Sequence, residues 1–152
     1  MKFTGRWRMF SALVLWAFAS CITTQKAIFF IEDLVGTWIN DEYAVIGASY
    51  SAKEVVTSDG VLKTYDQLTD TKQRNTYKLS IVESWYDENG DIWFKCVWEK
   101  IGAAAEVDTI HFFYSINKLS SSGTVWECCW KASDYPTELS LLAGGFTVHF
   151  RQ

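Results

Sequence analysis

The side chains best suited to catalysis or metal binding are few and widely spaced in this chain. The two histidines, His111 and His149, each lie beside aromatic residues within predicted strands. No zinc-ligand spacing, G-x-S-x-G, phosphate-binding loop or dinucleotide fingerprint accompanies them. We therefore expect both histidines to be structural or solvent-facing. We also expect no metal, no cofactor and no enzymatic activity.

Three of the cysteines fall in predicted strands. Cys128 and Cys129 are adjacent, so their side chains point to opposite faces of a strand and are not expected to pair with each other. Cys96 occupies a similar place in an apolar pattern and would bridge to Cys128 if the two strands were close. Free, buried thiols are the favoured alternative.

Acidic residues gather in two predicted turns. Asp87, Glu88 and Asp91 form one group, and Asp66 and Asp70 form the other. Either group could hold calcium loosely, but no twelve-residue calcium loop is present. Solvated turn carboxylates are the favoured interpretation.

The first 20 residues have the pattern of a secretory signal peptide. Lys2, Arg6 and Arg8 form a basic start, and residues 9–19 form an apolar run of 11 residues. Such a run is short for a bilayer-spanning helix, which needs about 20 residues. We expect residues 1–20 to direct export and to be cleaved.

Two cleavage sites compete at the end of this segment. Cleavage after Ala19 would release a soluble exported protein. Cleavage before Cys21 would follow Phe18-Ala19-Ser20-Cys21, which resembles a bacterial lipobox with phenylalanine in the usual leucine position. We favour lipidation of Cys21, because a cysteine that follows small residues directly at the end of an apolar signal run is seldom accidental. Acyl chains there would hold the protein at a membrane surface without a spanning helix. Residues 21–33 would then serve as a tether and lead-in.

The charge balance argues against a nucleic-acid surface. The formal net charge is −4, and the signal segment holds three of the 14 basic residues and no acidic residue. The remainder therefore carries 11 basic against 18 acidic residues, a net charge of −7, and contains no basic run. Phosphate binding needs clustered lysine and arginine, so we expect no nucleic-acid partner.

The rest of the chain is typical of an all-β domain built from hairpins. Asp59-Gly60 and Asn89-Gly90 separate strand-like runs, and Ser122-Gly123 marks a third turn. Seven or eight strands in hairpin order favour an antiparallel up-and-down barrel over residues 34–152. The predicted strands cover residues 34–40, 53–57, 61–68, 74–86, 92–99, 106–117, 124–131 and 146–150.

Aromatic residues at alternate positions predict the interior of this barrel. The candidate ligand-lining residues are Tyr77, Phe94, Trp98, Phe112, Tyr114, Trp126 and Trp130. In the last strand, Phe146, Val148 and Phe150 share one apolar face. These side chains could form a solid core, or they could line a cavity for a flat or acyl ligand.

The first predicted strand carries a family resemblance. Gly36-Thr37-Trp38 resembles the G-x-W signature of lipocalins, and Arg151 stands where that family has a basic residue packed over the tryptophan. Simple alternation puts Phe150 rather than Arg151 on the inner face, so this contact would require a bulge or a fold beneath the barrel. Together with the hairpins and Ser133-Asp134-Tyr135-Pro136-Thr137, residues 34–152 resemble short bacterial lipocalin-like lipoproteins. The resemblance implies a barrel with an apolar pocket.

Two functions follow as hypotheses. The first is an exported, lipid-anchored cell-envelope protein that binds a small hydrophobic ligand in its barrel. The second is a non-enzymatic envelope module with a packed barrel that binds another protein. Trp85, Trp93 and Phe113 are predicted to face outward and would supply that surface.

Overall fold

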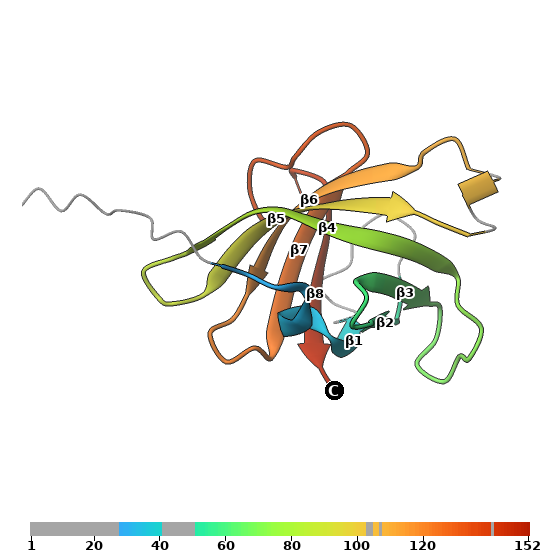
Figure 1. The fold of residues 1–152 in the computed structure, drawn as a ribbon, viewed down its shortest axis with the longest axis horizontal. Helices are drawn as coiled ribbons and strands as arrows, with labels where there is room; N and C mark the ends of the chain where they lie inside the picture. Colours follow the sequence, from blue (N-terminus) through green and yellow to red (C-terminus); the bar gives the residue numbers. More distant parts are fainter. Residues whose placement is uncertain (1–27, 41–50, 103–104, 107, 141) are drawn as a thin grey trace, which may run out of the picture.

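Eight antiparallel strands form a closed barrel in a computed structural model of the chain (Figure 1). The structure describes residues 28–40, 51–102, 105–106, 108–140 and 142–152. Each strand pairs with the next, and β8 pairs with β1. The predicted all-β, up-and-down barrel is therefore confirmed. The strands are β1 (Gly36–Asn40), β2 (Lys53–Val56), β3 (Val61–Tyr65), β4 (Asn75–Tyr86), β5 (Ile92–Lys100), β6 (Phe112–Leu119), β7 (Val125–Lys131) and β8 (Gly145–Arg151).

Glycines close the three predicted hairpins. Gly60, Gly90 and Gly123 have φ values of 77°, 79° and 69°, a left-handed conformation that other residues adopt at a cost. They join β2 to β3, β4 to β5 and β6 to β7. A register shift between Ile81 and Glu83 adds a bulge to the β4–β5 ladder, and bulges of this kind bend a strand.

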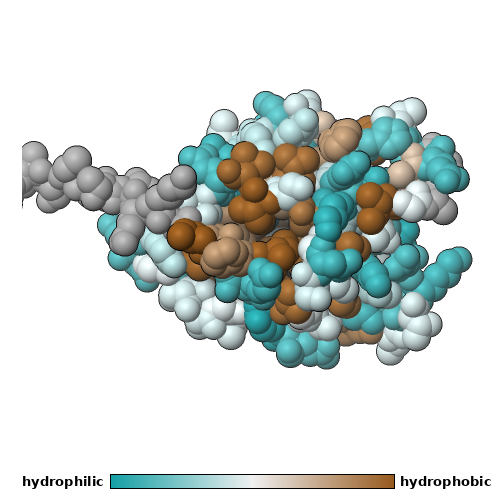
Figure 2. Space-filling view, in the orientation of Figure 1, coloured by the Kyte–Doolittle hydropathy of each residue, from teal (hydrophilic) through white to brown (hydrophobic). Residues whose placement is uncertain are grey.

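The chain before β1 covers one end of the barrel, which we call the floor. A short 3₁₀ helix, η1 (Ile31–Leu34), leads into the first strand. Phe29 is buried and stacks on Phe94 at 4.3 Å between ring centroids, and Leu34 is fully buried. Ile28 and Phe30 stay 75% and 60% exposed. Figure 2 shows apolar side chains gathered on the face beside this lead-in.

Trp38 and Arg151 complete the floor. Trp38 is fully buried and donates its indole N–H to the Leu34 carbonyl at 2.8 Å. Arg151 lies opposite Trp38 in the β1–β8 ladder, and its guanidinium carbon sits 4.6 Å from the ring centroid. The same guanidinium donates to the Asp33 carbonyl. Gly36, two residues before Trp38, has φ of 144°, a backbone conformation that residues with a side chain rarely adopt.

The inner face of β8 is the polar face, which corrects the prediction for this strand. Thr147 and His149 are buried inside the barrel, and Arg151 follows them on the same side. Arg151 therefore reaches Trp38 by simple alternation, without a bulge. Phe150 on the opposite face is 44% exposed.

Strand β6 is also inverted relative to the prediction. Residues directly opposite in an antiparallel ladder share a face, and Phe113, Ser115 and Asn117 lie opposite the inward residues Trp98, Cys96 and Phe94. The inner residues of β6 are thus Phe113, Ser115, Asn117 and Leu119, which leaves Phe112 and Tyr114 on the outside. This is the opposite of the prediction.

A second apolar cluster accounts for the difference from the prediction in both strands. Ile116, Cys129 and Ala143 are buried together on the outer surface of the barrel, and Leu139 and Phe146 pack against them. The segment between β7 and β8 supplies Leu139 and Ala143, so it covers the outer faces of β6, β7 and β8. Apolar residues on these outer faces are therefore buried without entering the barrel.

Candidate functional site

Aromatic side chains line the barrel interior at the end opposite the floor. Tyr77 approaches Trp98 at 5.8 Å and Phe113 at 5.9 Å between ring centroids. Phe113 meets Trp130 edge-on at 5.7 Å. Phe113 and Trp130 are only partly buried, so they lie at the margin of the interior. Offset and edge-to-face contacts of this kind stabilise the wall and hold its rings in place.

The aromatic wall continues to the floor. Trp98 lies 6.4 Å from Trp126, and Trp126 meets Trp38 edge-on at 5.6 Å. Trp126 and Trp38 are both fully buried. One connected set of rings therefore runs from the partly exposed end of the barrel to its closed end.

The absence of a side chain at Gly145 leaves room for the Trp130 ring at this margin. The Trp130 ring lies against Gly145 on the neighbouring strand, where an added Cβ would come within 2.5 Å of the ring. A larger residue at position 145 would therefore displace the ring. The glycine lets the ring approach the backbone of β8 closely.

Five of the seven candidate lining residues face the interior. The inward residues are Tyr77, Phe94, Trp98, Trp126 and Trp130. Phe112 and Tyr114 were assigned wrongly, because the inner face of β6 is the other one. Phe112 is 46% exposed, and Tyr114 packs on Tyr135 at 5.3 Å on the outside.

A buried glutamate and a buried histidine meet in the layer directly above the floor. Glu54 on β2 and His149 on β8 are both buried, and their Oε2 and Nε2 atoms are 3.0 Å apart. Glu54 lies opposite Trp38 and His149 lies opposite Asn40 in the ladders on either side of β1, so the two side chains meet across the inner face of β1. The His149 ring also stacks on Trp126 at 4.5 Å. The sequence does not reveal this pair, because its members are 95 residues apart and neither belongs to a motif.

Serine and asparagine side chains add further polar groups to the interior. The Ser51 hydroxyl donates to Glu54 Oε1 at 2.8 Å, and the Asn40 amide group donates to the Ser51 carbonyl. On β6, the Asn117 amide donates to the Ser115 hydroxyl at 2.8 Å and accepts the Trp126 indole N–H at 3.0 Å. The interior therefore combines an aromatic wall with several fixed polar groups.

The thiols are free and protonated. Cys96, Cys128 and Cys129 form no disulfide, and β6 stands between the strands of Cys96 and Cys128. Burial raises the pKa of Cys96 to about 12 and holds the pKa of Cys128 well above its usual value. Neither interior thiol is therefore a thiolate nucleophile at neutral pH. Burial also raises the pKa of Tyr77 to about 12.

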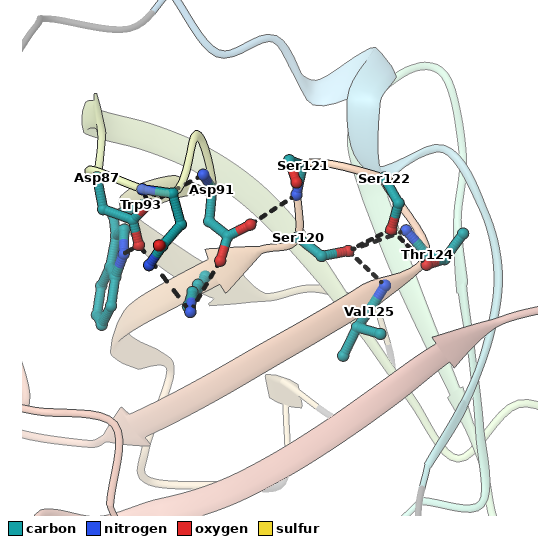
Figure 3. A network of polar contacts seen from close by, with 10 residues as sticks. Asp87, Asp91, Trp93, Ser120, Ser121, Ser122, Thr124 and Val125 are labelled. Carbon is teal, nitrogen blue, oxygen red and sulfur yellow. Dashed lines mark hydrogen bonds and ion pairs between the residues drawn. The ribbon is translucent and has the colours of Figure 1, made fainter.

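The acidic turn between β4 and β5 ties two hairpins together (Figure 3). Asp91 accepts the Ser121 N–H at 2.8 Å and pairs with Lys118 at 2.9 Å. Asp87 accepts the Trp93 indole N–H at 2.9 Å. The bond from Trp93 lowers the pKa of Asp87, and the bond from Lys118 lowers the pKa of Asp91. These carboxylates already have protein partners, which supports a structural role for the turn.

Within the described ranges, no three histidine, cysteine, aspartate or glutamate side chains form a group that could hold a metal ion. Helices in the part of the chain that the structure describes are too short or too polar to cross a membrane. Cys21 and the signal segment lie outside the described residues. Comparison of the chain with protein-family models, curated proteins and solved structures finds no match.

Proposed function

We propose that this chain is an exported, lipid-anchored, lipocalin-like protein of the bacterial cell envelope that binds a small hydrophobic ligand inside its barrel. It is a binding protein and not an enzyme. The observation that carries the proposal is the aromatic wall from Phe113 and Trp130 down to Trp126. Binding sites for small molecules are mostly apolar and contain a few well-placed polar groups, and this interior has that composition.

The lead-in supports an anchored location. Ile28 and Phe30 are large, exposed apolar residues, and Ile28 lies seven residues after Cys21. Seven extended residues span at most about 25 Å, so an acylated Cys21 would hold these side chains near the bilayer. Apolar side chains there would add to the membrane affinity of the acyl chains.

The alternative of a protein-interaction module rested on an exposed aromatic patch, which the positions of its three residues do not support. Phe113 faces the interior, which corrects the prediction that it faces outward. Trp85 and Trp93 are partly buried and stack on each other at 6.3 Å against the outer apolar cluster. These three residues therefore form no exposed aromatic patch.

Ligand binding is tested by titrating the purified protein with N-phenyl-1-naphthylamine, an apolar probe whose fluorescence rises on burial. We expect saturable binding of one probe per chain. Phe113→Ala removes an inward ring and should weaken binding about tenfold, in line with the 1–2 kcal/mol that partial burial of an aromatic side chain contributes. Phe112→Ala removes the same side chain from the outer face of the same strand.

Phe112→Ala is therefore the matched control and should bind the probe as the unmodified protein does. Equal losses in the two variants would place the probe on the outer surface. Absence of saturable binding to the unmodified protein would show that the barrel is a solid core. Either result would contradict the proposal.

The anchor is tested by the intact mass of the product made from the full chain in a bacterial host. We expect the mass of a chain that begins at Cys21 and carries a diacylglyceryl group. The mass of an unmodified chain that begins at Ser20 would show cleavage after Ala19. The protein would then be a soluble exported barrel, and the anchored location would be wrong.

A further inference from the structure

Strand β4 extends well beyond its pairing with β3. It has 12 residues, whereas β3 has five and pairs only with Asn75–Lys78. The end of β4, from Ser80 to Tyr86, pairs with β5 on one side and with none of the described strands on the other. This stretch of β4 is the place where the lead-in, residues 28–34, meets the barrel.

Two contacts fix the course of the lead-in along this stretch. Ile31 Cγ1 would be 3.5 Å from a Cβ atom at Gly60, and the Gly60 carbonyl accepts the Leu79 N–H at 2.9 Å. Phe29 stacks on Phe94 of β5, which lies beside the last residues of β4. The lead-in therefore follows the end of β4 in the opposite direction and covers the interior there.

Three large apolar side chains on this part of the wall point into solvent. Phe29 is buried, so its neighbours in the extended lead-in, Ile28 and Phe30, point outward and are 75% and 60% exposed. Val82, at the bulge of β4, is 59% exposed, whereas Ile81 before it packs on the core. We call Ile28, Phe30 and Val82 the wall patch, and Figure 2 shows apolar side chains gathered beside the lead-in.

The position of the proposed anchor favours a lipid bilayer as the partner of the wall patch. Cys21 precedes Ile28 by seven residues, which span at most about 25 Å when extended. Acyl chains at Cys21 would therefore keep the patch close to the bilayer. The chain beyond the signal segment has 11 basic and 18 acidic residues, a net charge of −7, so attraction to anionic lipids is not expected to drive the contact. Burial of apolar side chains at the edge of the acyl region is the remaining driving force.

We propose that the wall patch docks on a lipid bilayer, with Ile28, Phe30 and Val82 inserted at the boundary between head groups and acyl chains. The side of β4 then faces the membrane, and β8, four strands further round the closed barrel of eight, faces away from it. This inference rests on the proposed function, because the acyl anchor brings the patch to the bilayer. It adds one fixed orientation of the barrel to the anchored location.

Dyes attached at single positions test the docking. Phe30→Cys, Val82→Cys and Phe150→Cys are each made in the full chain, purified from a bacterial host, labelled with a nitrobenzoxadiazole dye and bound to phosphatidylcholine vesicles. Phe150 is the matched control, because it is a phenylalanine that is 44% exposed on the outer face of β8. The three cysteines of the barrel are buried and should not react with the label.

Quenching by phosphatidylcholine that carries a nitroxide on its acyl chain reports contact with the bilayer. We expect the dyes at positions 30 and 82 to be quenched and to shift their emission to the blue, and the dye at position 150 to keep its emission. Equal quenching at all three positions would show that the floor, and not the side of β4, meets the membrane. Blue-shifted dyes at positions 30 and 82 that escape quenching would show that a second copy of the chain covers the patch.

Either of these two results would overturn the inference. Protein that floats with the vesicles while no dye is quenched would also overturn it, and the lipid anchor of the proposed function would stand. Protein that does not float with the vesicles would show that both the anchor and the docking are wrong. Two labelled positions in the patch keep the test decisive if one of the variants fails to fold.

Discussion

Replacing His149 with phenylalanine is expected to lower the free energy of unfolding by about 3–5 kcal/mol, the usual cost of removing one member of a buried ion pair. Phenylalanine preserves a ring that can stack on Trp126, so loss of packing is a minor part of the cost. The larger part is the Glu54 carboxyl group, which stays buried without the His149 ring nitrogen that faces it at 3.0 Å. Urea denaturation followed by tryptophan fluorescence measures the change.

A second substitution separates charge from packing. Glu54→Gln introduced into the His149→Phe protein removes the unpaired charge, so the double variant should be more stable than His149→Phe alone. His111→Phe is the matched control, because His111 is exposed, and it should change stability by less than about 0.5 kcal/mol. If the two interior substitutions simply add, the pair does not act as a unit and the account of the polar layer is wrong.

Replacing Trp38 with alanine is expected to cost about 3–5 kcal/mol, the range for truncating a buried tryptophan. The ring is fully buried, and it joins Trp126, the Leu34 carbonyl and the Arg151 guanidinium at the floor. Its loss would leave a cavity where the lead-in meets the barrel. Thermal unfolding followed by circular dichroism measures the effect.

Trp38→Phe is the companion variant. It retains most of the apolar volume and loses the hydrogen bond to the Leu34 carbonyl, so it should cost about 1–2 kcal/mol. Equal losses in the two variants would indicate that the hydrogen bond, and not packing, stabilises the floor. A loss below about 1 kcal/mol in Trp38→Ala would contradict the claim that packing of the Trp38 ring stabilises the floor.

The hairpin framework could be predicted from the sequence because each signal is local. Gly60 and Gly90 follow residues typical of tight turns, and the runs on either side of them pair in the structure. The Trp38–Arg151 contact was also predictable, because closure of an up-and-down barrel brings the last strand beside the first. These features need only the order of the strands.

The inner faces of β6 and β8 could not be predicted from hydrophobicity. Ile116 and Phe146 are apolar, yet they pack on the outside beneath the segment between β7 and β8. Asn117 and His149 are polar, yet they are fully buried inside the barrel. Alternation identifies two faces of a strand, but only the covering segment and the interior hydrogen bonds decide which face points inward.

The polar layer depends on contacts between distant parts of the chain. Glu54 and His149 lie in β2 and β8, and nothing near either residue in the sequence marks it as buried. Their contact follows from the place of β1 between the two strands. The sequence therefore predicted the barrel and most of its aromatic wall, and only the structure revealed the buried Glu54–His149 pair.

The most direct test of ligand binding inside the barrel is the nuclear magnetic resonance of the tryptophan indole N–H groups during titration with N-phenyl-1-naphthylamine. Trp98, Trp126 and Trp130 face the interior, whereas Trp85 and Trp93 lie on the outer face and serve as an internal control. Ring currents of the bound probe should shift the interior resonances and leave the outer pair unchanged. Shifts confined to Trp85 and Trp93, or no saturable shift in any indole, would contradict the account.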